Sequence, residues 1–201
     1  MPDPLPPDHD IEEAILVKHV LGGNRDAFRQ LIRRYERLVC SIVFKMIDGK
    51  EDREDICQEV FINVYDKLSS FRFQSKLSTW IGNIAFNKAV NFLKKRKYQL
   101  LEDMYRPIGD DSETLKYEET AELTDALPLP DEKLFNKERI VLLHKAMNRL
   151  TPVQRTIVQL FHQQDCSLDD ITSITGLPVN TVKSHLFRAR KTLKSEVLKK
   201  L

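Results

Sequence analysis

Apolar residues recur at helical spacing along most of the first half of the chain. Residues 11–21, 24–47, 51–68 and 77–97 each place apolar side chains three or four positions apart, which predicts four amphipathic helices. The inward stripes expected for the second and third are Phe28, Leu31, Ile32, Tyr35, Leu38, Val39, Ile42 and Met46, then Ile56, Val60, Phe61, Val64 and Leu68. Few segments alternate as strands do, so the pattern predicts an all-α protein.

Helical spacing resumes in the last third of the chain. Residues 138–150 form an amphipathic segment whose expected inward side chains are Ile140, Leu143, Met147 and Leu150. Thr151 then supplies a capping hydroxyl, Pro152 suits the first helical position, and Gln154 stands where a capping box needs it. A second helix is therefore predicted to begin at residue 152.

Residues 167–190 are typical of two short helices joined by a tight turn. Ser167 and Asp170 have capping-box spacing, Gly176 can adopt a positive φ, and Pro178 fits the first turn of the next helix. The apolar stripe expected on that helix is Val179, Val182, Leu186, Ala189 and Leu193. The polar and cationic residues off the stripe are Asn180, Thr181, Lys183, Ser184, Phe187, Arg188 and Lys191. Such a helix fits a DNA major groove, although a solvated face in a partner-binding bundle has the same pattern.

Composition and charge divide the chain into parts. The 201 residues are 41% hydrophobic and 31% charged, with a net charge of +2. Residues 1–98 sum to +3, residues 99–137 to −7 and residues 138–201 to +6. The acidic, proline-bearing middle predicts a flexible linker between two small domains, 11–98 and 138–201, with 1–10 as a disordered tail. The sequence has neither a secretory leader nor an apolar run long enough for a membrane, so we expect a cytoplasmic protein without membrane insertion.

The sequence gives little support to metal or cofactor chemistry. The sequence has three widely spaced cysteines, Cys40, Cys57 and Cys166. This spacing predicts thiols packed as small apolar groups, and not disulfides or a zinc site. Asp52, Asp55 and Glu59 share one helix face and would suit a metal-dependent nuclease, but no second acidic segment accompanies them. We expect no metal, no cofactor and no catalytic residues.

Four segments of the sequence resemble bacterial RNA polymerase sigma factors of the extracytoplasmic-function (ECF) group. They are residues 24–35 (the opening helix of the family), 52–61 (its polymerase-binding helix), 71–92 (its promoter-melting segment) and 150–155 with the helix-turn-helix (its second domain). The resemblance implies a sigma region 2-like domain over 11–98 and a sigma region 4-like helix-turn-helix domain over 138–201. Two positions depart from the family pattern: Thr172 replaces a usual alanine, and His185 replaces a common arginine.

This resemblance implies a specificity subunit that brings core RNA polymerase to promoters and starts strand opening. The polar helix face described above would read the upstream (−35) element as duplex DNA. The downstream (−10) element would be bound as it melts, because exposed bases stack on aromatic rings and their phosphates attract cations. The residues expected there are Phe73, Ser75, Lys76, Ser78, Thr79, Asn83, Lys88, Lys94, Lys95 and Arg96, with Phe71 and Trp80 in the core.

Partners are also implied by the resemblance. The first domain would bind the clamp of the polymerase's largest subunit through Asp52, Asp55, Gln58 and Glu59. The second would bind the flap of the second-largest subunit, and an anti-sigma protein would hold the factor inactive. Two other functions stay open from the residues themselves: a dimeric regulator that reads a palindrome, and the nuclease above.

Overall fold

The structure, a computed structural model, describes residues 8–105 and 142–198, and every regular element among them is a helix. The N-terminal module consists of α1 (Asp8–Leu21), α2 (Arg25–Met46), α3 (Lys50–Lys67), the 3-10 turn η1 (Leu68–Ser70) and α4 (Leu77–Tyr105). The C-terminal module consists of a helical segment over 142–148, followed by α6 (Pro152–Gln163), α7 (Leu168–Thr175) and α8 (Val179–Leu198). The all-α prediction is confirmed. None of the described helices is both long and apolar enough to cross a bilayer.

The predicted helix starts are confirmed by their caps. The Asn24 side chain accepts hydrogen bonds from the amides of Asp26 and Ala27, at 2.9 and 3.1 Å, where α2 begins. Thr151 and Gln154 form a reciprocal capping box at α6. Each cap satisfies amides that the first helical turn leaves free, which stabilises that end by about 1 kcal/mol.

The N-terminal module has a compact core built from the predicted stripes. Leu31, Val39 and Ile42 of α2 are fully buried, and all five inward residues expected on α3 and η1 are buried as well. The Tyr35 hydroxyl donates a hydrogen bond to the carboxylate of Glu13 from α1, and both side chains are buried. A buried carboxylate needs such partners because burial removes its hydration.

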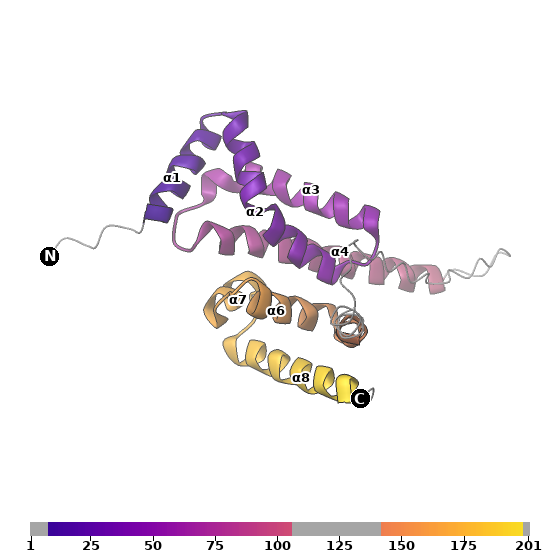
Figure 1. Cartoon of the computed structure of the whole chain (residues 1–201). Helices are drawn as coiled ribbons and strands as arrows, with labels where there is room; N and C mark the ends of the chain where they lie inside the picture. The colour runs from indigo at the N-terminus through magenta and orange to yellow at the C-terminus, as the bar shows by residue number, and fades with distance from the viewer. Residues whose placement is uncertain (1–7, 106–141, 199–201) are drawn as a thin grey trace, which may run out of the picture.

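The two modules pack directly against each other. In Figure 1, α6 and α7 lie against the α1–α4 module, and α8 lies on their far side. The contacts join α7 to α4 and α6 to α2. A β-carbon added at Gly82 of α4 would lie 3.1 Å from Cγ1 of Ile174 in α7, so the absence of a side chain there permits close approach. Ile174 is 1% exposed and belongs to an apolar core that continues across both modules.

Some predicted boundaries differ from the structure. Helix α4 continues to Tyr105, eight residues beyond the predicted end at Lys97 and into the predicted linker. Helix α1 begins at Asp8, inside the predicted tail. The rest of the predicted linker, up to residue 137, and tail residues 1–7 lie outside the described residues.

Two side chains predicted to face inward do not. Leu143 is 50% exposed, and Ala146 and Leu150 take the buried positions of that segment. Val179 is 36% exposed because it is the first residue of α8, ahead of the positions that face α6 and α7. Helical spacing identifies a stripe but not where along the helix the neighbouring elements stop.

Candidate nucleic-acid and polymerase interfaces

Helix α8 has one buried face and one exposed face. Val182, Leu186 and Ala189 are buried against the rest of the module. The turn that aims the helix is made by Gly176, whose φ of 68° is the left-handed conformation that favours glycine. Six of the seven predicted DNA contacts are exposed and Thr181 is half-buried: Asn180, Thr181, Lys183, Ser184, Phe187, Arg188 and Lys191.

The exposed face of α8 is chemically mixed. Phe187 is 71% exposed, which is unusual for a large apolar side chain, and cationic Arg188 follows it. The Ser184 hydroxyl donates back to the Asn180 carbonyl at 2.9 Å, so its oxygen still has accepting capacity. Cations, short polar groups and apolar side chains are the kinds of group that contact base edges in the major groove.

The two departures from the family pattern lie toward the interior. His185 is half-buried, and burial together with the nearby Arg188 cation lowers the pKa of His185. It is therefore neutral at pH 7 and does not supply the positive charge of the usual arginine. Thr172 is half-buried in α7, and its hydroxyl oxygen is buried without a hydrogen-bond partner among the described residues.

Three aromatic residues near the start of α4, Phe71, Phe73 and Trp80, differ in how far they are buried. Phe71 is buried, with its ring centroid 5.3 Å from that of partly buried Trp80, as expected for core residues. Phe73 is 52% exposed, and its centroid lies 4.7 Å from that of Phe71. Its φ of 55° is rare for a bulky residue and costs about 1–3 kcal/mol. A strained turn thus holds one aromatic ring in solvent.

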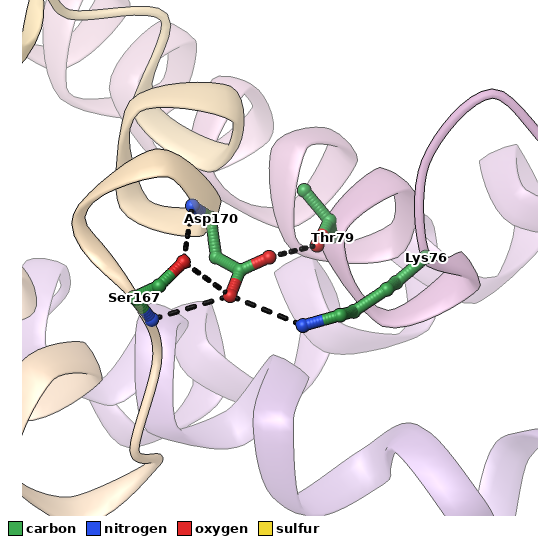
Figure 2. Close-up of polar contacts among 4 residues, drawn as sticks. All are labelled: Lys76, Thr79, Ser167 and Asp170. Atoms are coloured by element: carbon green, nitrogen blue, oxygen red, sulfur yellow. Dashed lines mark hydrogen bonds and ion pairs between the residues drawn. The ribbon is translucent and has the colours of Figure 1, made fainter.

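Three of the polar side chains predicted for the −10 element contact α7 in this structure. Figure 2 shows Lys76 and Thr79 pointing at Asp170. The Lys76 Nζ lies 3.3 Å from Oδ2 of Asp170, and the Thr79 hydroxyl donates to Oδ1 at 3.4 Å. The Asn83 amide nitrogen donates to the carbonyls of Ser173 and Ile174, at 3.1 and 3.0 Å. Of the other two hydroxyls predicted there, one is exposed and one half-buried: Ser75 and Ser78.

Asp170 has two roles at this contact. It completes the capping box with Ser167, whose amide donates to it at 3.2 Å, and it receives Lys76 and Thr79 from the other module (Figure 2). Burial by itself raises the pKa of Asp170, but the bonds from Ser167 and the Lys76 ammonium outweigh it and hold the pKa below the ordinary aspartate value. The sequence predicted the cap only, because nothing in local spacing indicates a partner more than 90 positions away.

The acidic face of α3 meets the basic run of α4. Asp52 pairs with Arg96 at 3.5 Å, and Glu59 pairs with Lys88 at 2.9 Å. A hollow between the two helices is lined by Asp52, Asp55, Ile56, Glu59, Phe92, Lys95 and Arg96. The sequence assigned these acids and bases to different partners, whereas the fold brings them together. Asp55, Gln58, Lys94 and Lys95 are exposed.

The cysteines and acidic residues do not form a metal site within residues 8–105 and 142–198. Asp52 and Glu59, two of the three carboxylates that suggested a nuclease, have basic partners instead. The Cys40 and Cys57 sulfurs lie 3.9 Å apart between α2 and α3. Sequence spacing did not indicate this thiol pair, because it depends on how the two helices face each other.

Comparison with known proteins agrees with this geometry. The family model for sigma-70 region 2 matches residues 31–98, and the model for sigma-70, region 4 matches residues 140–193. The chain is similar to the ECF RNA polymerase sigma factor SigW of Bacillus subtilis, with 28% identity over 90% of this chain and 94% of that one. It is similar to the ECF RNA polymerase sigma-E factor of Escherichia coli, with 29% identity over 93% of this chain and 95% of that one.

Solved structures with the same fold include the sigma factor RpoE of Bartonella quintana, in complex with the anti-sigma factor NepR. The TM-score is 0.61 at 22% identity, over 85% of this chain and 96% of that one. CnrH, in complex with the cytosolic domain of CnrY, gives a TM-score of 0.59 at 19% identity, over 91% of this chain and 95% of that one.

The fold and the exposed face of α8 define a two-module helical protein that reads DNA with a helix-turn-helix. The two sigma-70 matches together span more than half of the chain, so it belongs to the sigma-70 family. Within that family it is an extracytoplasmic-function RNA polymerase sigma factor. Such proteins bind core RNA polymerase, direct it to promoters, and are initiation factors and not enzymes.

Proposed function

We propose that α8 reads the −35 element in the major groove through its seven predicted residues. The observation that carries this assignment is the division of α8 into a buried stripe and an exposed face with Phe187 and Arg188. Arg188 is suited to a guanine edge and Phe187 to a thymine methyl group, while Lys183 and Lys191 are suited to phosphates.

The −10 element, in this proposal, binds around Phe73 and the start of α4. An extruded base stacks on the exposed Phe73 ring, which gains about 1–3 kcal/mol, against the few kcal/mol that unstacking costs. The hydroxyls of Ser75, Ser78 and Thr79 and the polar ends of Lys76 and Asn83 hold the separated strand. Phosphates are held by the basic residues farther along α4: Lys88, Lys94, Lys95 and Arg96.

Polymerase binding, in this proposal, uses the acidic face of α3 against the clamp and the C-terminal module against the flap. Asp55 and Gln58 are exposed and available to a basic partner. Asp52 and Glu59 contribute by exchanging their basic partners on α4, Arg96 and Lys88, for basic residues of the polymerase. The energy for strand opening comes from these contacts with polymerase and DNA. The protein acts in the cytoplasm, with functional boundaries at 11–98 and 138–201.

An anti-sigma protein, we further propose, holds this factor inactive. The support is that the solved structures with the same fold, RpoE and CnrH, were determined with NepR and with the cytosolic domain of CnrY. A partner that binds across both modules would prevent access to polymerase.

The test is reconstitution of the purified chain with core RNA polymerase on a supercoiled promoter template. We expect transcripts from defined start sites only when the chain is present. Binding to a palindromic duplex without polymerase would instead support a dimeric regulator, and Mg²⁺-dependent cleavage a nuclease. Within the active holoenzyme, Arg188→Ala should cost about 1–3 kcal/mol at one base pair of the −35 element. An equal loss on every template would assign Arg188 to phosphate.

A further inference from the structure

Helices α2 and α3 pack along a seam that has an aromatic contact on either side of its middle. The rings of Phe28 and Tyr65 meet edge to face, with their centroids 4.9 Å apart. Toward the other end of the seam, the Arg53 guanidinium lies over the Phe44 ring, 5.3 Å from its centroid. Because an early residue of α2 meets a late residue of α3 and the reverse, the two helices run antiparallel. These contacts fix the spacing of the side chains between them.

Cys40 of α2 and Cys57 of α3 face each other between these two aromatic contacts. Their sulfurs lie 3.9 Å apart, and both side chains are half-buried. A hydrogen bond from the Cys57 thiol lowers the pKa of Cys40 to about 7, although burial and the Glu36 carboxylate act in the other direction. The same hydrogen bond, together with burial, raises the pKa of Cys57. At pH 7 the pair therefore combines a partly ionised thiol with one that keeps its proton.

This combination is suited to oxidation by a peroxide, because the thiolate is the nucleophile and a second thiol completes the disulfide. The Cys40 thiolate attacks one oxygen of hydrogen peroxide, the O–O bond breaks, and hydroxide leaves and takes up a proton. The Cys57 sulfur then attacks the sulfur of the Cys40 sulfenic acid. The S–O bond breaks, and the leaving oxygen takes the Cys57 proton as water. In sum, two thiols are oxidised to one disulfide, and one peroxide is reduced to two waters.

The third cysteine of the chain has a different environment. Cys166 lies between α6 and α7 and is half-buried, and burial together with the Asp170 carboxylate raises its pKa. Its thiol is therefore protonated at pH 7 and reacts slowly with peroxide. It provides an internal reference for the reactivity of Cys40.

A disulfide at the seam would turn α3. The two sulfurs have to approach by about 2 Å to reach bonding distance. Asp55 and Glu59 each lie two positions from Cys57, which places them roughly half a turn away, on the opposite side of α3. A roll of α3 that brings Cys57 toward α2 therefore turns this acidic face as well. It also strains the pair of 2.9 Å that Glu59 makes with Lys88 of α4.

We propose that Cys40 and Cys57 form a peroxide-oxidised thiol pair whose disulfide weakens the binding of α3 to RNA polymerase. The reduced chain is the active form, and a dithiol reductant restores it by thiol–disulfide exchange. Disulfides of this transient, redox-sensing kind are the ones found in cytosolic proteins. The inference rests on the proposed assignment of α3 to the polymerase clamp.

The chemistry is tested on the full-length chain with hydrogen peroxide, at a dose that leaves Cys166 unmodified. Peptide mapping of the wild-type chain should find a disulfide between Cys40 and Cys57. In Cys57→Ser the sulfenic acid on Cys40 has no thiol to react with, so a cyclic dione that traps sulfenic acids should label Cys40. In Cys40→Ser the dione should leave Cys57 unlabelled. Two free thiols in the treated wild-type chain, or a label on Cys57, would overturn the proposal.

The effect on polymerase is measured after the peroxide has been removed, by titrating labelled chain with core enzyme. We expect the oxidised chain to bind about fivefold or more weakly, the loss that follows removal of one substantial interface contact, and a dithiol reductant to restore the affinity. Cys166→Ser is the matched control and should respond as the wild type does, whereas Cys40→Ser and Cys57→Ser should not respond. Equal affinity of the oxidised and reduced wild-type chains, or a loss that persists in Cys40→Ser, would contradict the proposal.

Two further measurements separate this inference from the proposed function. If the reduced chain supports no promoter-specific transcription, or if Asp55→Arg leaves its affinity for core polymerase unchanged, the assignment of α3 is wrong, and redox control through α3 is wrong with it. If both behave as expected while the oxidised and reduced chains bind alike, only the redox control is wrong.

Discussion

Replacing Gly82 by valine tests whether the two modules are held together by close packing. A β-carbon at Gly82 would lie 3.1 and 3.2 Å from two carbons of Ile174, whereas carbon atoms prefer about 3.5–4.0 Å. Overpacking of this kind costs about 1–3 kcal/mol. Removal of a glycine from a helix interior also stabilises α4 itself, because glycine is among the least favourable residues there, about 1 kcal/mol worse than alanine, and valine recovers part of that difference.

These two terms act on different equilibria. The helix-propensity gain favours folding of the N-terminal module in any arrangement, whereas the steric cost arises only when α7 is docked. We therefore expect Gly82→Val to weaken docking by about 1–3 kcal/mol while each module stays folded. Cross-linking of Lys76 to Asp170 should fall, the radius of gyration in small-angle X-ray scattering should rise, and calorimetric unfolding should separate into two transitions.

The control is a size exchange across the contact. Ile174→Ala removes the atoms that the valine meets, so it should restore part of the docking in the Gly82→Val background, although on its own it costs about 2–5 kcal/mol by leaving a cavity. A double-mutant cycle measures this coupling. Additive effects of the two substitutions, or a Gly82→Val chain as compact and as readily cross-linked as wild type, would refute the reasoning.

Three further outcomes follow from individual contacts. Asp55→Arg should weaken core polymerase binding about tenfold or more, which corresponds to about 1.4 kcal/mol, and the control Glu54→Arg should weaken it less. If a titration with labelled chain gives the two variants equal affinity for core polymerase, Asp55 is not part of the interface. Burial and a hydrogen bond to a carboxylate raise the pKa of Tyr35, so the folded state keeps this proton when the unfolded state loses it above pH about 10. Denaturant titrations should therefore show stability falling by up to about 1.4 kcal/mol per pH unit above that value, and Tyr35→Phe should lack this component of the decline. Because a hydrogen bond from Cys57 lowers the pKa of Cys40 to about 7, mild oxidation should form a disulfide between these two cysteines; peptide mapping that found both thiols free would contradict this.

Local sequence was sufficient for most helix boundaries and for the polar face of α8. The caps at Asn24, Thr151 and Ser167 and the turn at Gly176 are short-range devices, in which a side chain or a backbone conformation satisfies groups within four residues. Amphipathic spacing likewise gave the buried stripes of α2 and α3, because a helix has only one face to bury. The prediction of inward-facing side chains was wrong at Leu143 and Val179, which are exposed because no neighbouring element covers them.

Contacts between distant segments could not be predicted in this way. The Asp52–Arg96 and Glu59–Lys88 pairs join residues assigned to different partners, and Lys76 reaches Asp170 across 94 positions of the chain. Each depends on which helix faces meet, and a single sequence contains no local signal for that. Charge and spacing predicted which groups bind DNA and polymerase, since those properties belong to single helices. Only the packing of α7 on α4 decided that Lys76, Thr79 and Asn83 contact α7 while the polar face of α8 stays exposed, because such contacts require two surfaces that the chain brings together only on folding.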